Sequence, residues 1–458
     1  MKLVAQQDGP ETLVSVQDSP QRRRLLQVKE ELEAKLARDN PGEWLSWWIA
    51  EDAFELPEHV IDKLRRAGPA LKRFFTVANQ LFLDEPWIQR RLEKRLSPNY
   101  ALLNRARPDD IPWLPRPDVV LDGNWQPKFV ELEVTVCARF DTAVMSEQYG
   151  IEPARGLVRN YAEHFKRHWP GKTLGLLVTP HPVWWYIIDE AIPFAARLRR
   201  EGVDAVVLGG PELARLRFDG QQLLLRQLDG SDQPIHVFDR FIDIYEIAEL
   251  QHPGMAPLLD AYLAGAVSSV NTCKQFLDEK EWLCLFWDPR LRDTWQRELG
   301  AEHDTLLRDM LPRTWRVEPG LTVELPSGDL VAIEELGELP AAQRAFVLKE
   351  SGTSSTASGA QSLQILSELS DDEVQTVLRE HLQDQVRPFV IQEIVESPRI
   401  SFTALNPNDG DKVVTEHGAR LKLSVFYVDD KMTDIKLIAS NGELAVNNRD
   451  CVEGIVRY

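Results

Sequence analysis

A strand-like run ending at Lys349 is followed by a loop of small residues. All ten residues from Ser351 to Ala360 are Ser, Thr, Gly or Ala. Small residues let backbone N–H groups approach an anion closely, and the hydroxyl groups add further donors. A lysine at the base of such a loop supplies the point charge that a phosphate needs. The pattern favours a phosphate-binding loop that includes Ser351, Gly352 and Thr353, with a flexible linker as the alternative.

Two carboxylates, Glu131 and Glu133, are two residues apart in a strand-like segment. Residues at this spacing point to the same face of a strand. Neighbouring carboxylates repel each other unless a cation compensates, and hard oxygen ligands at this spacing suit Mg²⁺. A solvated strand face is the alternative. Arg116 and Asp118 precede the partner strand of the same predicted hairpin.

A third segment, residues 387–396, is rich in apolar residues and contains Gln392, Glu393 and Ile394 at its end. An edge strand of this kind can offer backbone N–H and C=O groups to an adenine ring. An ordinary strand inside a sheet is the alternative interpretation.

The composition is that of a globular protein. The chain has 458 residues, of which 43% are hydrophobic and 27% charged, and this excludes a disordered chain. Its 53 Lys and Arg against 72 Asp and Glu give a net charge of −19, so nucleic acid and membrane surfaces are not expected as partners. Four cysteines without paired spacing argue against disulfides and structural zinc, and no apolar run is long enough for a signal peptide or a membrane span. We expect a cytoplasmic protein.

The periodicities predict a mixed α/β (α+β) fold. Helical patterns dominate residues 1–105, which are expected to form an N-terminal helical lobe. Strand–helix–strand patterns predict an α/β lobe over residues 106–275. Residues 276–458 contain mostly antiparallel strands with few helices, and residues 318–340 have the Gly and Pro content of a linker.

Several short motifs in a fixed order resemble the circularly permuted ATP-grasp ligases, such as glutathione synthetase and the synthetase half of glutathionylspermidine synthase. They are Arg116-x-Asp118, Phe129-Val-Glu131-x-Glu133, Arg240 after a strand, Lys280 in Leu-Asp-Glu-Lys-Glu, Leu311-Pro-Arg-Thr, Lys349 with its loop, and the 392–394 strand end. The resemblance covers about residues 105–458, with residues 276–458 as the nucleotide-binding lobes.

The resemblance implies an enzyme that uses ATP and Mg²⁺ to activate a small-molecule carboxylate as an acyl phosphate, which an amine then attacks to form an amide. The substrates would be of the amino acid or peptide kind. Lys280 and Lys349 would hold the phosphates, and Arg116 or Arg240 would grip the acyl phosphate or the substrate carboxylate. Glu131, Glu133 and Glu350 would hold Mg²⁺. Lys274 lies outside every motif and is expected to be a surface charge.

The sequence departs from the family pattern at several places, one of them Ile438, where the family has an arginine. Glu133 stands where the family has Asn, the glycine-rich loop is rich in Ser and Thr, and Thr353 stands where the family has a metal-binding Glu, with Glu350 as the candidate replacement. These departures support a second hypothesis, a degenerate and non-catalytic ATP-grasp-like module that binds a nucleotide or a partner protein.

Overall fold

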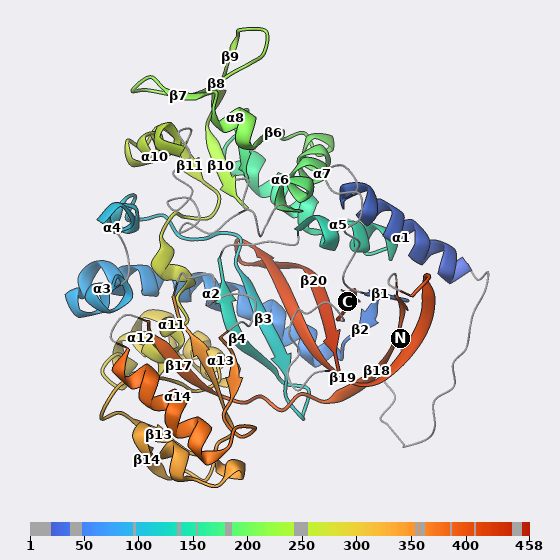
Figure 1. Ribbon diagram of the computed structural model, residues 1–458. Coiled ribbons are helices and arrows are strands. Elements are labelled where there is room, and N and C mark those ends of the chain that lie inside the picture. Colours follow the sequence, from blue (N-terminus) through green and yellow to red (C-terminus); the bar gives the residue numbers. More distant parts are fainter. Residues whose placement is uncertain are drawn as a thin grey trace.

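We describe the protein from a computed structural model. The structure describes residues 20–36, 48–94, 98–134, 139–152, 154–178, 186–241, 255–352, 357, 362–384, 387–406, 409–441 and 451–458. Figure 1 shows a large central sheet, with an α/β layer on one side of it and a smaller antiparallel lobe on the other. The expected mixed α/β fold is confirmed.

The large sheet has eight strands in the order β18-β1-β21-β20-β19-β3-β4, with β2 beside β21. Its strands are β1 (Trp48–Ala50), β2 (Phe54–Glu55), β3 (Arg116–Leu121), β4 (Pro127–Glu133), β18 (Arg399–Asn406), β19 (Lys412–Val428), β20 (Lys431–Ser440) and β21 (Val452–Arg457). The three chain ranges predicted from the sequence therefore all contribute strands to one sheet. As domain boundaries, these ranges stay a prediction.

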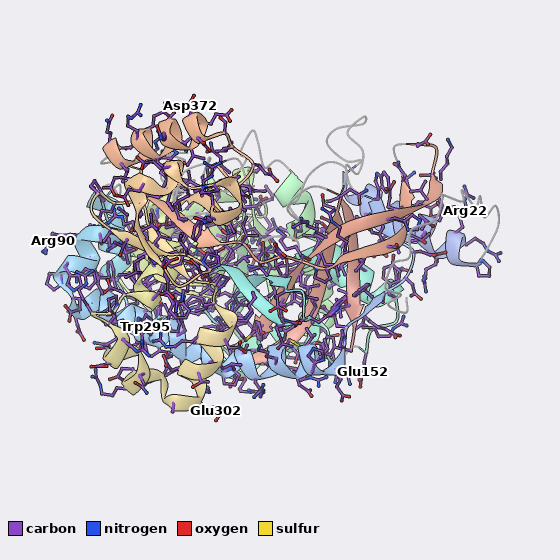
Figure 2. All side chains as sticks on the ribbon, turned by 90° about the horizontal axis from the view of Figure 1, so that it is seen from below. Arg22, Arg90, Glu152, Trp295, Glu302 and Asp372 are labelled. Atoms are coloured by element: carbon purple, nitrogen blue, oxygen red, sulfur yellow. The ribbon has the colours of Figure 1, made fainter. Side chains whose placement is uncertain are left out.

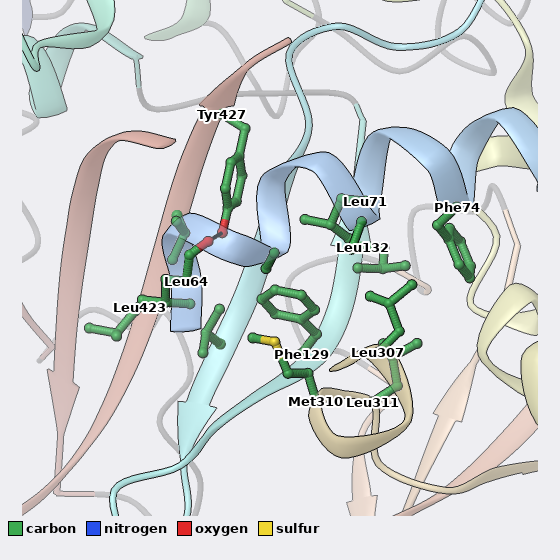
Figure 3. Close-up of a cluster of buried hydrophobic side chains, with 14 of the residues drawn as sticks. Leu64, Leu71, Phe74, Phe129, Leu132, Leu307, Met310, Leu311, Leu423 and Tyr427 are labelled. Atoms are coloured by element: carbon green, nitrogen blue, oxygen red, sulfur yellow. Dashed lines mark hydrogen bonds between the residues drawn. The ribbon is translucent and has the colours of Figure 1, made fainter. Parts of the chain in front are cut away.

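One face of the large sheet is apolar and is covered by helices. Phe129 and Leu132 on β4 point toward Leu71 on the long helix α2 and toward Met310 on α13, as Figure 3 shows. These residues share one continuous buried cluster with Leu423 of β19. The helices on the N-terminal side are α1 (Pro20–Leu36), α2 (Glu58–Asp84), α3 (Pro86–Leu92) and α4 (Pro98–Arg105). This packing makes the sheet a rigid platform for its opposite face, which carries polar side chains on β3 and β4.

The α/β layer is built on a parallel sheet of order β11-β10-β5-β6. A small antiparallel sheet, β7-β8-β9, extends from it. The elements of this region are α5 (Arg139–Gln148), α6 (Leu157–His168), β5 (Thr173–Leu177), α7 (Tyr186–Arg200), β6 (Asp204–Leu208), α8 (Gly210–Leu213), β7 (Leu216–Phe218), β8 (Leu223–Arg226), β9 (Asp232–Ile235), β10 (Val237–Arg240), α10 (Met255–Leu263) and β11 (Ser268–Ser269). In parallel sheets, ligand-binding residues gather beyond the carboxyl ends of the strands, and Arg240 is the last residue of β10.

The smaller lobe is an antiparallel sheet of order β12-β17-β15-β16, with apolar side chains of α14 packed on it. Helix α14 begins where Ser370 and Glu373 form a reciprocal capping box. Between the α/β layer and this lobe, η1 (Gln275–Asp278), α11 (Glu281–Trp287), α12 (Arg292–Leu299) and α13 (Ala301–Met310) pack in the cluster of the large sheet. The elements of the lobe are β12 (Thr314–Arg316), β13 (Thr322–Glu324), β14 (Leu330–Ala332), η2 (Ile333–Glu338), η3 (Ala341–Gln343), β15 (Phe346–Glu350), β16 (Gln364–Ile365), α14 (Asp371–Gln383) and β17 (Phe389–Glu393).

The linker expected at residues 318–340 is wrong. The antiparallel pair β13–β14 and the turn η2 occupy it, and Val323 and Ile333 are buried against the smaller lobe. The Gly and Pro residues there serve turns between ordered elements.

Charged side chains cover the periphery of the molecule. In Figure 2, Arg90, Glu302 and Asp372 project from the outer rim. Among the residues that the structure describes, no helix combines the length and the apolar character needed to cross a membrane.

Candidate functional site

A β-bulge in β4 sets the direction of the acidic side chains. Asp118 on β3 pairs with Glu131, but the next residue, Val119, pairs with Phe129, so Val130 is an extra residue on β4. The bulge changes the alternation, and Phe129 and Leu132 both point into the core while Glu131 stays on the polar face. The polar face of β4 therefore carries Glu131, and the apolar face keeps its packing.

Lys280 and Glu131 form an ion pair on this polar face. Lys280 Nζ lies 2.9 Å from Glu131 Oε1 and donates a hydrogen bond of 3.0 Å to the carbonyl oxygen of Ala357 in the small-residue loop. Burial alone would raise the pKa of Glu131, but the ammonium groups of Lys280 and Lys349 lower it, so the carboxyl stays ionised. The Glu131 side chain is 37% exposed, which leaves it accessible to a ligand.

Lys349 reaches the same place from the smaller lobe. Its ammonium group donates to Gln392 Oε1 at 2.8 Å and to the carbonyl oxygen of Val130 at 3.3 Å, and both acceptors are neutral. Burial and the nearby Lys280 lower the pKa of Lys349 to about 8, although Glu131 opposes the shift. The structure thus brings Lys280, Lys349 and Glu131 together from three separate elements, α11's N-terminus, β15 and β4.

Arg116 and Asp118 of β3 lie next to the cluster of Lys280, Lys349 and Glu131. Arg116 binds Glu133 directly, and its Nε lies 3.8 Å from Asp118 Oδ1. Asp118 also accepts hydrogen bonds of 2.8 Å each from Lys422 and Ser424 on β19. Burial would raise the pKa of Asp118, but Lys422 and Arg116 hold it at about 2. Glu133 thus has a guanidinium partner, whereas Glu131 has an ammonium partner.

The loop residue Ser351 has a structural contact. It is fully buried, and its hydroxyl donates to Glu279 Oε2 at 2.8 Å and accepts from the backbone N–H of Glu281 at 3.1 Å. Ser351 therefore ties the start of the loop to the turn that carries Lys280. Gly352 has a φ of +115°, a conformation that strains any residue with a side chain. Thr353 lies outside the described residues.

The structure does not bring Glu350 to the other acidic residues. Glu350 follows Lys349 on β15, so the two side chains point to opposite faces of the strand. Its carboxylate acts on His381 and Arg387, near α14. In the described part of the chain, no group of three or more His, Cys, Asp or Glu side chains is arranged to hold a metal. Mg²⁺ commonly uses one or two carboxylates together with substrate phosphates and waters, and Glu131 and Glu133 fit that role.

A pocket of about 420 Å³ lies between the β3–β4 turn and the end of β17, and neither Glu131 nor Lys280 nor Lys349 lines it. Glu393 and Ile394, at the end of β17, line it, and so do Lys128 of β4 and Trp287 of α11. Glu393 accepts a hydrogen bond of 3.1 Å from the backbone N–H of Arg313. Burial raises the pKa of Glu393. Gln392 instead points to the opposite side of β17, toward Lys349 and Thr314.

Arg240 lies deeper than the lysines. It is fully buried and donates two hydrogen bonds to the carbonyl oxygen of Thr272, and its NH2 group lies 3.6 Å from Asp278 Oδ2. Asp278 in turn accepts from the backbone N–H of Val134, just after β4. Arg240 thus connects the end of β10 to the segment that precedes Lys280.

The expectation that Lys274 is a surface charge is wrong. Lys274 is fully buried, and its ammonium group donates to Asn79 Oδ1 and to the carbonyl oxygens of Pro108 and Asp110, at 2.7 to 2.9 Å. A lysine with three hydrogen bonds satisfies its buried charge without a carboxylate. Lys274 is therefore a structural residue.

The sequence matches no protein-family model and no curated protein. Solved structures do match it. A glutathione synthetase-like effector from Globodera pallida, in its apo form, is similar with a TM-score of 0.60 and 12% identity, over 97% of this chain and 99% of that chain. The chain has a glutathione synthetase-like fold. The resemblance found in the sequence is thus confirmed for the fold.

A second solved structure is a protein from Methylobacillus flagellatus provisionally named γ-glutamylcysteine synthetase. It has a TM-score of 0.41 and 12% identity, over 84% of this chain and 86% of that chain.

Proposed function

We propose that this protein is an ATP-dependent carboxylate–amine ligase that forms an amide through an acyl phosphate. The observation that carries the proposal is the convergence of Lys280 and Lys349 on Glu131, within a glutathione synthetase-like fold. Two buried ammonium groups and one carboxylate suit a metal-bound polyphosphate, because phosphoryl transfer depends on positioning and on neutralising charge.

The roles follow from the contacts. The pocket beside Glu393 and Ile394 would take the base, and Lys349 and Lys280 would hold the phosphates. Glu131 and Glu133 would hold Mg²⁺, which supplies charge stabilisation for the phosphoryl group in flight. The pairs Lys280–Glu131 and Arg116–Glu133 would then separate, so both cations become available to anions.

Arg116 would orient the substrate carboxylate, since a guanidinium can bind a carboxylate through two parallel hydrogen bonds. Arg240, held by Thr272 and Asp278, would support the position of Lys280 from behind. The rigid large sheet fixes Arg116 and Glu131 relative to each other, as transition-state positioning requires.

The first experiment is titration of Mg²⁺ and a non-hydrolysable ATP analogue, AMP-PNP, into the wild-type protein by calorimetry. We expect binding that requires Mg²⁺ and weakens in Lys349→Ala by roughly tenfold to a hundredfold, the worth of a charge-assisted hydrogen bond. Lys412→Ala is the matched control, because Lys412 lies on β19 with an exposed side chain that pairs with Asp409. Equal affinities in all three proteins would remove the basis of the proposal.

The second experiment measures ADP release with pools of amino acids, short peptides and polyamines. A ligase releases ADP only when both a carboxylate and an amine substrate are present. We expect this dependence in the wild type and its loss in Lys349→Ala.

A second candidate function is a nucleotide-binding module without chemistry. It is favoured by the arrangement of the acidic residues, because Glu133 is bound by Arg116 and Glu350 faces away from the site. Nucleotide binding without ADP release for any pair of substrates would favour this candidate.

A further inference from the structure

Helix α11, which begins directly after Lys280, is too short to fix its own first turn. It has seven residues, and Lys280, in the position before its first turn, offers no side-chain oxygen to cap it. Helices of this length are marginal by themselves, and helix ends fray. The position of Lys280 therefore depends on contacts that come from other elements.

Ser351 supplies the first of these contacts. Its hydroxyl accepts a hydrogen bond of 3.1 Å from the backbone N–H of Glu281 and donates one of 2.8 Å to Glu279 Oε2, so it holds both neighbours of Lys280. Ser351 comes directly after β15, two residues after Lys349. The segments that carry the two lysines of the site are thereby fixed to each other.

The side chain of Glu281 supplies the second contact, and it is held from two sides. It is 1% exposed, and its Oε1 lies 3.0 Å from Nε of Arg91 and 2.9 Å from Nε of Arg316. Arg316 belongs to β12 of the smaller lobe. Arg91 belongs to α3, whose apolar side chains are buried in the cluster of the large sheet. Glu281 thus joins α3 to the smaller lobe at the residue next to Lys280.

This buried ionic group has a better explanation in position than in stability. The side chains of Arg91 and Arg316 are 12% and 10% exposed, and Glu318 lies 3.9 Å and 3.5 Å from them. Burial opposes the charge of Arg91, but Glu281 raises its pKa above the ordinary value. Desolvation offsets most of the attraction in such groups, and in several proteins they serve to fix one arrangement of the chain.

We propose that Arg91 is a positioning residue of the phosphate site and that it holds Lys280 in place through Glu281. The inference rests on the proposed function, which gives Lys280 the phosphates. It assigns a part of the site to the N-terminal helices, which lie outside the range of the family resemblance.

The charge of Lys280 has other sources. Burial would lower its pKa, but Glu131, Glu279 and Asp278 raise it. These carboxylates keep the ammonium group charged, and the contribution of Arg91 is to fix the residue that follows Lys280. Replacement of Arg91 should therefore act on nucleotide affinity only as long as Lys280 is present.

The test is a double-mutant cycle on the affinity for Mg²⁺–AMP-PNP, measured by calorimetry on the full-length protein. Arg91→Met is expected to weaken binding roughly tenfold in the wild-type background and less than about twofold in Lys280→Ala. The second effect is small because a residue that acts through Lys280 has nothing to act on once its ammonium group is gone. Arg90→Met is the matched control, since Arg90 is the exposed neighbour on the same helix (Figure 2).

Two further variants protect the test against a folding defect. Circular dichroism on heating shows whether each variant unfolds cooperatively. If Arg91→Met does not, Arg91→Gln, which keeps a hydrogen-bond donor for Glu281, takes its place in the cycle. Arg91→Lys keeps the charge and is expected to recover most of the lost affinity.

A merely structural role, or attraction of the nucleotide by the charge of Arg91 at a distance, predicts a different pattern. Arg91→Met would then weaken binding by the same factor in both backgrounds, and this result overturns the inference. Unchanged affinity in Arg91→Met overturns it as well. Wild-type protein that does not bind Mg²⁺–AMP-PNP would instead overturn the proposed function, and the inference with it, so the two failures are distinguishable.

Discussion

Lys349 is the group through which pH should control nucleotide binding. Burial and Lys280 hold its pKa at about 8 in the free protein, and its hydrogen bonds go to two neutral oxygens. A bound phosphate would raise this pKa, because an opposite charge favours the protonated amine. The protonated protein therefore binds the nucleotide, and the affinity should fall as the pH rises through the free-state pKa.

The magnitude follows from that pKa. The protonated fraction of an amine with a pKa of about 8 falls from about 0.9 at pH 7 to about 0.1 at pH 9. The affinity should fall by about tenfold over this range, since phosphates with a second pKa near 6 are already ionised. The lowered pKa of Lys349 also makes the stability of the fold depend on pH, and the stability changes in the direction opposite to the nucleotide affinity. Between about 8 and the ordinary value of 10.5 the unfolded chain binds more protons at this site, so the free energy of unfolding rises with pH.

The assay is calorimetric titration of Mg²⁺–AMP-PNP at pH 7, 8 and 9. We expect the wild type to lose about tenfold in affinity over this range. Lys349→Met should bind weakly at every pH, and Lys349→Arg should bind without pH dependence, because a guanidinium stays charged. Lys412→Met should behave like the wild type. A Lys349→Met protein with the full pH dependence would refute the reasoning.

Three further predictions follow from single contacts. Glu131→Gln removes the ion-pair partner of Lys280, so the affinity for ADP without Mg²⁺ should rise by up to about fivefold, the worth of a partly exposed ion pair. In this variant Mg²⁺ should no longer improve ADP binding. Titrations that match the wild type both with and without Mg²⁺ would contradict this. Lys274→Met leaves three oxygen acceptors without their donor, so it should lower the free energy of unfolding by on the order of 2 kcal/mol relative to Lys412→Met. Urea denaturation measures this difference, and equal stability would contradict the prediction. A chain ending at Glu443 loses β21, which pairs with β1, β2 and β20, so circular dichroism should show no cooperative unfolding, and a cooperative transition would refute its structural role.

The local elements could be predicted from the sequence because their signals are local. The β3–β4 hairpin and strands β15 and β17 lie where the sequence predicts them. Short motifs predict Lys280 and Lys349 as phosphate-binding residues, and this role stays a prediction. The fold that those motifs imply is confirmed by the similarity to a glutathione synthetase-like structure. Short strands such as β1 and β2 were missed, since two or three residues carry no periodicity.

Lys422 and Lys274 show what the sequence could not supply. Lys422 stands between Leu421 and Leu423, and this alternation places it on a polar face. Which strands share that face depends on the order of the sheet, and β19 reaches β3 across some 300 residues of chain. Lys274 is buried by acceptors from α2 and from the segment at 108–110, which are likewise distant in sequence. Neither environment has a local signal.

Glu131 and Glu350 point in different directions because side chains alternate between the two faces of a strand. The direction of Glu350 can be predicted from this alternation, whereas that of Glu131 depends on a bulge. Lys349 and Glu350 are neighbours on a strand, so period-two alternation already requires that a cleft-facing Lys349 turn Glu350 toward α14. On β4 the same rule would place Glu131 beside Phe129, on the apolar face. The extra residue Val130 reverses that parity, and the two side chains point to opposite faces. The bulge leaves one residue of β4 without a partner on β3. It places the ionised carboxylate of Glu131 next to the ammonium groups of Lys280 and Lys349 and keeps it out of the core. Deletion of Val130 would make Phe129 and Glu131 neighbours on opposite faces, so we expect the shortened strand to pair regularly, keep Glu131 on the polar face and retain a cooperative unfolding transition in circular dichroism.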